Sequence, residues 1–371
     1  MSGLAPIQAP RRALLCGYYG EHNLGDDALL KVLSQQLPEG WKPVITARDS
    51  AAVQTLVPQG STVNRRSLKA VLRSIRKVDV VVFGGGSLLQ DSTSFGSLLY
   101  YILVIVVAKI NGKPVLLWGQ GLGPLHQAWS RLMVRQALSW TTSISWRDPA
   151  SLELAERLKV RTSMSVAPDP VWSHPVPPYQ GGRTIVLCWR PTHLLSDPGW
   201  KHLLEAVDQL SEITGKSITW LAFHTIQDVD LLPTLKKKGL VSKRLSAKSQ
   251  TITVTTINQA QEIFRKSSLV IAMRLHALIL AIIGRCPTAG LSYDPKVEAA
   301  AKTAEIPWID LRQLPSIGQL LEQWRMCMSA PPSISRIHQV RNESLKHESI
   351  LQDELRKLDR NNGYNRVNMQ T

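Results

Sequence analysis

Short apolar runs that end in glycine or in a polar loop, each followed by a stretch with helical spacing, recur along the first half of the chain. Such an alternation of strand and helix patterns predicts a parallel sheet wrapped by helices. The expected strands are RALLCGYYG (12–20), WKPVITARD (41–49), VDVVVFGGG (78–86), KPVLLWGQG (113–121), SISWRD (143–148) and MSVAPDP (164–170).

The same alternation restarts after residue 175. Its expected strands are TIVLCWRP (184–191), SITWLAFH (217–224), TITVTT (251–256), SSLVIAM (267–273) and CPTAGLSYD (286–294). We therefore predict an α/β protein of two Rossmann-like parallel-sheet domains that face a cleft, the GT-B-like architecture.

The boundaries follow from composition. Residues 173–183 (SHPVPPYQGGR) are dense in proline and glycine and predict a linker between an N-terminal domain at 13–172 and a C-terminal domain at 184–334. Residues 1–12 are expected to be flexible. Residues 335–371 are expected to form one charged helix as far as residue 360, followed by a loose tail.

The length and the composition suit two folded domains. The chain has 371 residues, of which 44% are apolar and 19% charged, as in folded globular proteins. Its four cysteines are far apart in mostly apolar surroundings, which predicts neither a metal site nor a disulfide framework and favours a reducing cytoplasm. The most apolar run, Leu98–Ile110, is shorter than the roughly 20 residues that a membrane crossing needs, so we expect a buried helix there.

The formal net charge of +16 favours anionic partners. No metal-finger spacing, RNP-like strand or helix-turn-helix pattern supports nucleic acid. The basic run at 234–249 (TLKKKGLVSKRLSAKS) is compatible with contact with an anionic membrane surface, and equally with a solvated charged face.

In parallel sheets, ligands bind beyond the carboxyl ends of the strands, so the residues that follow each apolar run are the candidates for a site. The loop GYYGEHNLGDDALL (17–30) carries Asp26 and Asp27 at the start of a helix. Either aspartate is a helix cap or a base that takes a proton from a sugar hydroxyl. The glycine spacing in this loop does not match GxGxxG, which argues against an ordinary dinucleotide site.

Three glycines, Gly84, Gly85 and Gly86, follow the strand VVVF. At the start of a helix their amides would form a nest for an anion or a polar ligand, although close packing between strand and helix also selects glycine. With Gly17, Tyr18 and Asn23 of the first loop, these glycines form the expected acceptor-binding or backbone-binding group.

Two arginines also follow strands. Arg147 comes after the strand in SISWRD, and Arg190 repeats that geometry in LCWRP of the second domain. Arg147 is expected to point into the cleft, and a salt bridge to Asp148 is the alternative.

The segment MRLHALILAIIGRCPTAGLSYDPKV (273–297) places Arg274 and His276 at the start of an apolar helix and Lys296 after the next strand. The helix dipole favours an anion there, although a histidine beside an apolar helix also has structural uses. Arginine binds carboxylate or phosphate with two parallel hydrogen bonds, and lysine adds a point charge. This set predicts a site for a small compound that carries both groups.

Seven segments, taken in order along the chain, resemble the polysaccharide pyruvyltransferase family, in particular its bacterial cell-wall CsaB type. They are GYYGEHNLGDDALL, GGGSLLQD, GQGLGPL, SWRD, PDPVW, RLHALILA and YDPKV. The resemblance covers nearly the whole chain up to about residue 330 and omits the first dozen residues and the tail.

The resemblance implies a transferase that moves the pyruvyl group of phosphoenolpyruvate onto a sugar as a 4,6-linked ketal and releases phosphate. The implied acceptor is an amino sugar such as N-acetylmannosamine in a lipid-linked cell-wall glycan precursor, where the ketal serves to anchor S-layer proteins. The enzyme would act in the cytoplasm, either free or as a peripheral protein on the inner face of the membrane, with no cofactor and no metal.

By the same resemblance, Arg147, His276 and Lys296 match the positions that hold phosphoenolpyruvate and carry out the chemistry. Arg190 and Arg274 are expected as helpers, by their geometry more than by a motif match. His276 is the expected acid.

Asp26 or Asp27 is the expected base, and the N-terminal domain takes the acceptor while the C-terminal domain takes the donor. The acceptor sugar, its carrier lipid and the oligomeric state stay open.

Two other functions fit parts of these patterns. A GT-B glycosyltransferase that uses a nucleotide sugar would share the cleft and the glycine-rich loops, and would be stabilised by a nucleotide sugar but not by phosphoenolpyruvate. A non-catalytic protein that binds a glycan or an anionic surface would keep its cellular effect after replacement of His276.

Overall fold

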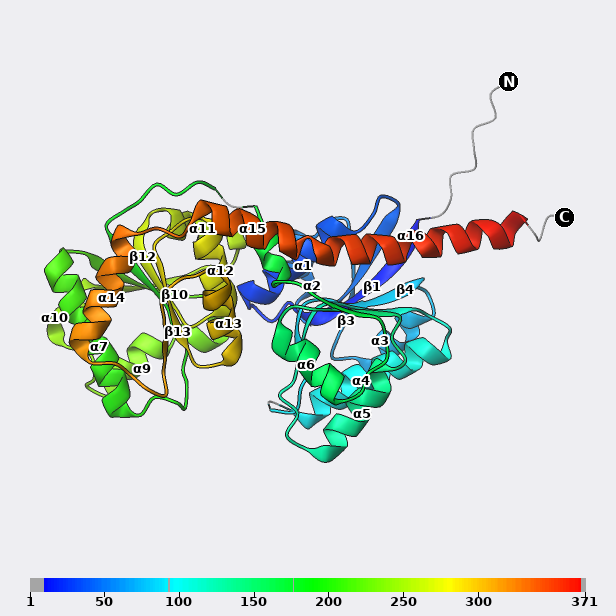
Figure 1. Ribbon diagram of the computed structural model, residues 1–371, viewed down its shortest axis with the longest axis horizontal. Coiled ribbons are helices and arrows are strands. Elements are labelled where there is room, and N and C mark those ends of the chain that lie inside the picture. Colours follow the sequence, from blue (N-terminus) through cyan, green and yellow to red (C-terminus); the bar gives the residue numbers. More distant parts are fainter. Residues whose placement is uncertain (1–9, 93, 176, 368–371) are drawn as a thin grey trace, which may run out of the picture. The chain divides into compact units, whose positions relative to one another are not determined.

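A computed structural model describes residues 10–92, 94–175 and 177–367. The chain divides into two compact α/β units. The first contains the residues up to Glu21, Leu29–Ala167 and the residues from Leu345 onward, and the second contains His22–Ala28 and Pro168–Ser344. Each unit is built on a parallel sheet with helices on both faces (Figure 1). The predicted fold class is therefore confirmed.

The sheet of the first unit has the strand order β3-β2-β1-β4-β6-β7-β8, and β5 pairs with β6. The expected strands are present, and the structure adds β3 and β5, which are only four residues long. The strands are β1 (Arg11–Tyr19), β2 (Trp41–Ala47), β3 (Ser61–Asn64), β4 (Val80–Phe83), β5 (Gly86–Leu89), β6 (Val115–Leu122), β7 (Ser143–Trp146) and β8 (Met164–Val166).

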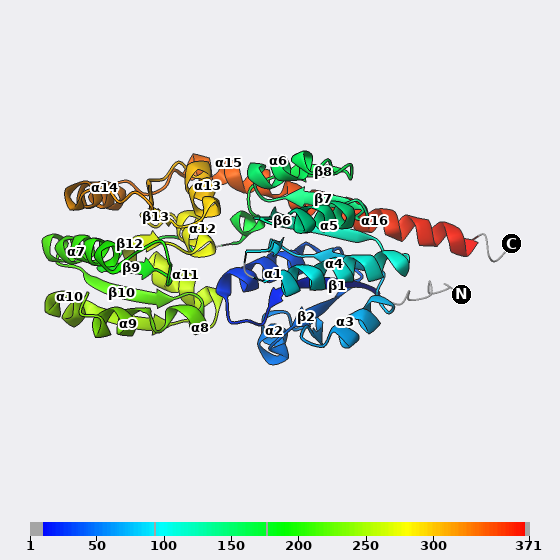
Figure 2. The ribbon, with the colours of Figure 1, turned by 90° about the horizontal axis from the view of Figure 1, so that it is seen from below.

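Helices cover both faces of this sheet (Figures 1 and 2). Buried side chains of α3, α4 and α5 pack with those of β1, β4, β6 and β7 in one apolar cluster. The helices are α1 (Leu24–Gln36), α2 (Ser50–Leu56), α3 (Leu68–Ile75), α4 (Phe95–Ile110), α5 (Ala128–Leu138), α6 (Pro149–Arg157) and α16 (Lys346–Val367).

The sheet of the second unit has the order β11-β10-β9-β12-β13-β14. Its strands are β9 (Thr184–Cys188), β10 (Ser217–Ala222), β11 (Ser249–Thr253), β12 (Ser267–Ala272), β13 (Thr288–Ser292) and β14 (Trp308–Asp310). Its helices are the short 3-10 helix η1 (Pro170–Ser173), α7 (Asp197–Thr214), α8 (Thr225–Asp228), α9 (Leu231–Lys237), α10 (Lys243–Lys248), α11 (Ile257–Arg265), α12 (Leu275–Ile283), α13 (Pro295–Thr303), α14 (Ile317–Ser329) and α15 (Ile334–Ser344).

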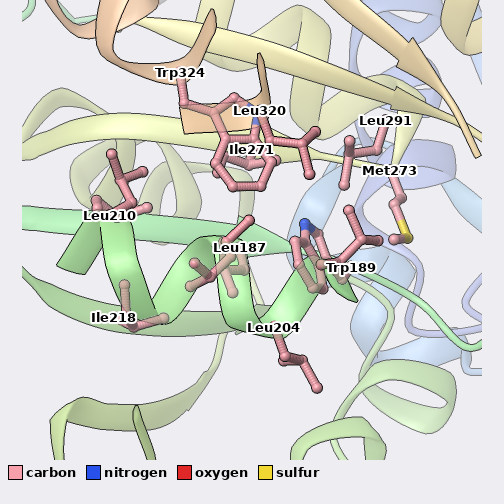
Figure 3. Packing of buried hydrophobic residues seen from close by; sticks show 14 of the residues in the cluster. Leu187, Trp189, Leu204, Leu210, Ile218, Ile271, Met273, Leu291, Leu320 and Trp324 are labelled. Atoms are coloured by element: carbon pink, nitrogen blue, oxygen red, sulfur yellow. The ribbon is translucent and has the colours of Figure 1, made fainter. Parts of the chain in front are cut away.

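The core of the second unit is a layer of aliphatic and tryptophan side chains between this sheet and the helices α7 and α14. Figure 3 shows Leu187 and Ile271 of the central strands with Leu204 of α7 and Trp324 of α14. These side chains are buried almost completely. Full burial of a large apolar side chain is worth about 1.5–3 kcal/mol, so this layer fixes the sheet whose carboxyl edge carries the predicted donor residues.

The C-terminal region differs from the single charged helix predicted for 335–360. It forms two helices, α15 and α16, which belong to different units. In α16, His347, Leu351 and Leu355 are buried. Residues 361–367 of the tail that was predicted to be loose continue α16, so the prediction is wrong there, and residues 368–371 lie outside the described residues.

The apolar run at Leu98–Ile110, predicted to be a buried helix, belongs to α4. Only one side of this helix is buried, by residues such as Tyr101 and Ile105, whereas Leu99 and Leu103 on the other side are exposed. The expectation of a buried helix therefore holds for one side of α4 and not for the other. In the described part of the chain, no helix is long and apolar enough to cross a membrane.

The proline-rich segment 173–183 begins at the last residue of η1. Val176 lies outside the described residues, and the described part of the segment contains no further helix or strand before β9. The Tyr179 hydroxyl donates to the Ser267 carbonyl at 2.9 Å. This segment lies within the second unit.

Candidate functional site

Both sheets reverse their strand order at a defined point, between β1 and β4 in the first unit and between β9 and β12 in the second. In open parallel sheets, ligands bind beyond the carboxyl ends of the strands at such a switch point. Three predicted residues of the second domain follow the strands at its switch point. Arg190 comes after β9, and Arg274 and His276 come after β12. Topology therefore brings these side chains to one edge.

His276 lies in the first turn of α12 and its side chain is only 12% exposed. Its Nε2 lies 3.5 Å from the Asp169 carboxylate. On the other side of the ring, Gly25 passes so close that a Cβ atom at this position would overlap Nδ1 of the imidazole. The ring is therefore confined between a carboxylate and a glycine backbone.

Asp169 was not among the predicted site residues. It caps η1, where one carboxylate oxygen accepts from the Val171 amide at 3.0 Å, and its other oxygen faces His276. A carboxylate in this position orients the imidazole. The sequence contained one signal, because Asp169 is the aspartate of the PDPVW segment that follows a strand.

The loop predicted to belong to the N-terminal domain is divided between the two units. Residues 22–28 belong to the second unit, where the Leu24 amide donates to the Phe223 carbonyl at 3.2 Å and Asn23 forms an antiparallel bridge with His224. Asp26 and Asp27 therefore lie in the same unit as His276, whereas Gly17 and Tyr18 lie in the first unit.

The two aspartates differ in environment. Asp26 accepts a hydrogen bond from the Asn23 side chain. Burial, together with the neighbouring Asp26 carboxylate, raises the pKa of Asp27 to about 7. A carboxylate with such a pKa takes up and releases a proton near neutral pH, as a general base must. Of the two, Asp27 has the properties of a base.

Arg274 occupies the N-cap position of α12 without a side-chain cap hydrogen bond, and its guanidinium is mostly buried. Nε donates to Asp228 at 3.1 Å, Nη2 donates to the other oxygen of the same carboxylate, and Nη2 also donates to Gln227 at 3.0 Å. The Asp228 carboxylate therefore already occupies the bidentate side of this arginine. This pairing leaves Nη1 as the part of Arg274 that can serve a ligand.

Lys296 lies in the first turn of α13, beyond β13, which is the neighbour of β12. Its Nζ is 3.1 Å from the Asp294 carboxylate, and Asp294 also caps the helix by accepting from the Lys296 amide at 3.1 Å. Arg190 donates to the Tyr293 hydroxyl at 3.0 Å and lies over the Tyr293 ring. Since Tyr293 also follows β13, Arg190 reaches across the end of β12.

Arg147 lies in the first unit, after β7, and its side chain is 4% exposed. Nη2 donates to the Ser87 hydroxyl at 2.9 Å, whereas the predicted alternative partner, Asp148, is 3.8 Å from Nε. Asp148 instead caps α6 by accepting from Ser151. A Cβ atom on Gly121 would lie 3.0 Å from the Arg147 Nε, so this glycine makes room for the guanidinium.

The three glycines at 84–86 were predicted to stand at the start of a helix. In the structure they lead into the short strand β5 instead. A Cβ atom would overlap the Tyr19 hydroxyl at Gly84 and would collide with Leu29 at Gly85. The Gly84 amide already donates to the Cys16 carbonyl at 2.9 Å. The glycines are needed for close packing, and the predicted row of open amides at a helix start is wrong.

A charged cluster at the ends of β1, β2 and β3 was not predicted. Glu21 is buried and accepts from Arg48 and from Arg65. The Arg65 guanidinium also lies 4.4 Å from the centre of the Tyr18 ring, and Tyr18 is 39% exposed. The cluster holds one aromatic face and two arginines at the carboxyl ends of β1, β2 and β3.

The cysteines are free and buried in the structure. Burial raises the pKa of Cys16 and of Cys286 to about 12, so neither thiol is a ready nucleophile. Among the described residues, His, Cys, Asp and Glu form no group of three or more that could hold a metal ion.

Comparison with known proteins identifies the family of this chain. The family model for polysaccharide pyruvyl transferase matches residues 23–295. The chain belongs to the polysaccharide pyruvyl transferase family. The protein is accordingly a transferase with a role in pyruvyl transfer to polysaccharide. The match contains Arg147, Arg190 and His276 and ends one residue before Lys296.

Solved structures share the fold of this pyruvyl transferase. The UDP-GlcNAc 2-epimerase of Methanocaldococcus jannaschii is 12% identical, with a TM-score of 0.62 over 92% of this chain and 99% of that one. The same epimerase from Neisseria meningitidis is 12% identical, with a TM-score of 0.59 over 92% and 99%. Acinetobacter baumannii MurG is 11% identical, with a TM-score of 0.50 over 93% and 100%. These similarities establish a GT-B-like fold. No curated protein sequence matches the chain.

Proposed function

We propose that this pyruvyl transferase uses phosphoenolpyruvate as its donor and forms a 4,6-ketal on a sugar, with release of phosphate. The observation that carries the proposal is the position of His276 between Asp169 and Gly25, at the sheet edge that also carries Arg274 and Lys296. The donor combines a carboxylate with a phosphate, and cationic side chains at a strand edge are suited to hold both.

His276 is the acid in this proposal. Its imidazolium gives a proton to C3 of the enol phosphate, which leaves an electron-deficient C2 and turns the methylene carbon into the methyl group of the product. The Asp169 carboxylate, 3.5 Å from Nε2, orients the ring for this transfer. Lys296 and Arg190 neutralise the phosphate and the carboxylate, and Arg147 is a further cation that we propose for donor binding.

The acceptor then attacks C2. One sugar hydroxyl adds to C2 as Asp27 takes its proton, and the C2–O bond to phosphate breaks with its electron pair going to phosphate. The second hydroxyl adds to the same carbon and closes the ring, and its proton goes to the released phosphate. The proton held by Asp27 returns to His276 through solvent. In total one enol phosphate and one diol give one ketal and one phosphate.

The proposed acceptor is an amino sugar of the N-acetylmannosamine type in a lipid-linked cell-wall glycan precursor, at the inner face of the cytoplasmic membrane. The exposed ring of Tyr18, held by Arg65 directly after β3, supplies a stacking face for a sugar. Arg48, which is 39% exposed, supplies a charge for an acidic group of the same glycan. The resulting ketal carboxylate would serve as an attachment point for S-layer proteins.

The test is to incubate the purified protein with phosphoenolpyruvate and a synthetic lipid-linked disaccharide that ends in N-acetylmannosamine, and to measure released phosphate together with product mass. We expect phosphate release that depends on the acceptor, a product with the mass of a pyruvyl ketal, and loss of both with Arg147→Ala. Binding of phosphoenolpyruvate without transfer would reject this acceptor. Stabilisation by a nucleotide sugar, with no binding of phosphoenolpyruvate, would favour a glycosyltransferase instead.

A further inference from the structure

The outer side of α4 and α5 in the first unit is unusually apolar for an exposed surface. On α4, Phe95, Leu99 and Leu103 follow each other at four-residue spacing, and each is at least 36% exposed. On α5, Trp129 is 72% and Leu132 is 55% exposed. We call these five side chains the α4–α5 face. The two helices are neighbours in the layer that covers one side of the first sheet (Figure 1).

A solvated surface does not account for this face. An amphipathic helix places charged or polar residues opposite its buried side, but α4 has no charged residue before Lys109. A helix that is apolar on every side requires burial on every side. Contiguous exposed apolar side chains that are rimmed by polar ones mark sites of interaction with proteins or membranes.

The charges around the face are of one sign. Between Asp91 and Asp148 the sequence contains no acidic residue and five Lys or Arg. Asp91 itself accepts from the amides of His126 and Gln127 at the start of α5. The exposed cations of α4 and α5 are Lys109, Arg131 and Arg135. The neighbouring α3 region adds exposed Lys69, Arg73, Arg76 and Lys77.

We propose that the α4–α5 face docks onto a bilayer surface that contains anionic lipids. Leucine and phenylalanine would enter the boundary between headgroups and acyl chains, tryptophan suits the interface, and the surrounding cations would pair with lipid phosphates. A second copy of the chain fits less well, since it would bring the same unbalanced cations against each other. The inference rests on the proposed function in one respect only: membrane docking would bring the enzyme to a lipid-linked acceptor.

The basic run at 234–249 offers less for this role. Its leucines at 235 and 245 are buried in the core of the second unit. Two of its cations are paired, because Lys238 contacts Asp197 and Arg244 contacts Asp208 and Glu212. This segment therefore presents partly neutralised charge without exposed large apolar side chains, and it provides the internal control.

Sedimentation with vesicles tests the proposal without any substrate. The full chain is mixed with vesicles of phosphatidylglycerol and phosphatidylcholine, or of phosphatidylcholine alone, at low and at high salt. We expect binding to the anionic vesicles that weakens as salt is added. Trp129→Glu, and the pair Arg131→Glu with Arg135→Glu, should each lower the partition coefficient by at least about tenfold.

The matched controls lie on the second unit. Met326→Glu charges a side chain that is 64% exposed, and Lys236→Glu with Lys237→Glu reverses two exposed charges of the 234–249 run. Both should leave vesicle binding within about twofold of wild type, since neither changes the proposed surface. An equal loss in the controls, or no binding of wild type to anionic vesicles, would overturn the assignment.

Two further measurements separate the remaining outcomes. Loss of a dimer in light scattering with Trp129→Glu, without vesicle binding by wild type, would assign the face to a second copy and reject the membrane. Pyruvyl transfer to a water-soluble acceptor analogue should be unchanged in Trp129→Glu. Because that assay contains no vesicles, failure of the proposed reaction and failure of the docking surface are distinguished.

Discussion

At the scale of single residues, the candidate site depends on how tightly His276 is confined. The imidazole has the Asp169 carboxylate at 3.5 Å on one side and the Gly25 backbone on the other. Such confinement fixes the orientation of both ring nitrogens. Proton transfer requires the donating nitrogen to be within hydrogen-bond reach of the substrate.

Gly25→Ala tests this confinement. A methyl group at residue 25 would overlap Nδ1 of His276, so the ring must move. We expect kcat for pyruvyl transfer to fall by about 100-fold or more, the usual size of a lost acid–base contribution. Gly318→Ala is the control, because a Cβ atom there meets nothing within 4 Å. Unchanged kcat in Gly25→Ala would show that His276 needs no fixed position.

Asp27→Asn tests the proposed base through its raised pKa. In the folded protein the pKa is about 7, against 3.8 as the ordinary value, so the fold favours the protonated carboxyl. The contribution of the protonated Asp27 to the free energy of unfolding is fully present below about pH 4 and is lost as the pH rises through about 7. Asp27→Asn should therefore melt at a higher temperature than wild type at about pH 8 and at a similar one at about pH 4.

If Asp27 is the base, kcat/KM of wild type should rise between about pH 6 and about pH 8, and the same substitution should remove that rise. Glu156→Gln, which changes an exposed carboxylate, provides the control for both measurements. Equal pH dependence of melting in wild type and Asp27→Asn would mean that Asp27 is already ionised at acidic pH.

At the scale of elements, the positions of the cationic side chains depend on the first residues of the helices that follow the strands. Asp294 caps α13 and also contacts the Lys296 ammonium. One carboxylate therefore both caps the helix and neutralises a residue that is predicted to bind the donor. Arg274 occupies the N-cap position of α12 without a side-chain cap, and its guanidinium is held by Asp228.

Asp294→Ala separates these two effects. Loss of the cap should cost about 1 kcal/mol of stability, as should Ser316→Ala, which removes the corresponding cap of α14. Only Asp294→Ala should lower KM for phosphoenolpyruvate, because it leaves the Lys296 charge without its carboxylate neighbour. Urea unfolding and steady-state kinetics measure the two quantities. Identical KM values in both variants would exclude Lys296 from donor binding.

At the scale of the whole molecule, the C-terminal helix completes the first unit. The His347 ring nitrogen lies 2.9 Å from the Ser145 hydroxyl of β7, and the ring packs edge-on against Trp118 of β6. Leu351 and Leu355 are buried further along α16. The N-terminal sheet therefore depends on residues from the other end of the chain.

Leu355→Ala should lower the free energy of unfolding by about 2–5 kcal/mol, the usual cost of a cavity in a core. Lys357→Ala, two residues away and exposed, should change it by less than about 0.5 kcal/mol. Hydrogen exchange should locate the loss in β6 and β7. An effect confined to α16 would mean that the helix is only an appendage.

The sequence by itself determined the class of fold and the family, because buried parallel strands require continuous apolar runs and a ligand edge requires polar residues directly after them. It also placed Arg147, Arg190, His276 and Lys296 at strand ends.

Only the tertiary structure decided the rest. The Asp169 contact with His276, the pairing of Arg274 with Asp228, the grouping of Asp26 and Asp27 with the second unit and the docking of α16 all join residues far apart along the chain. Local patterns report how one segment is buried, but not which distant segment buries it.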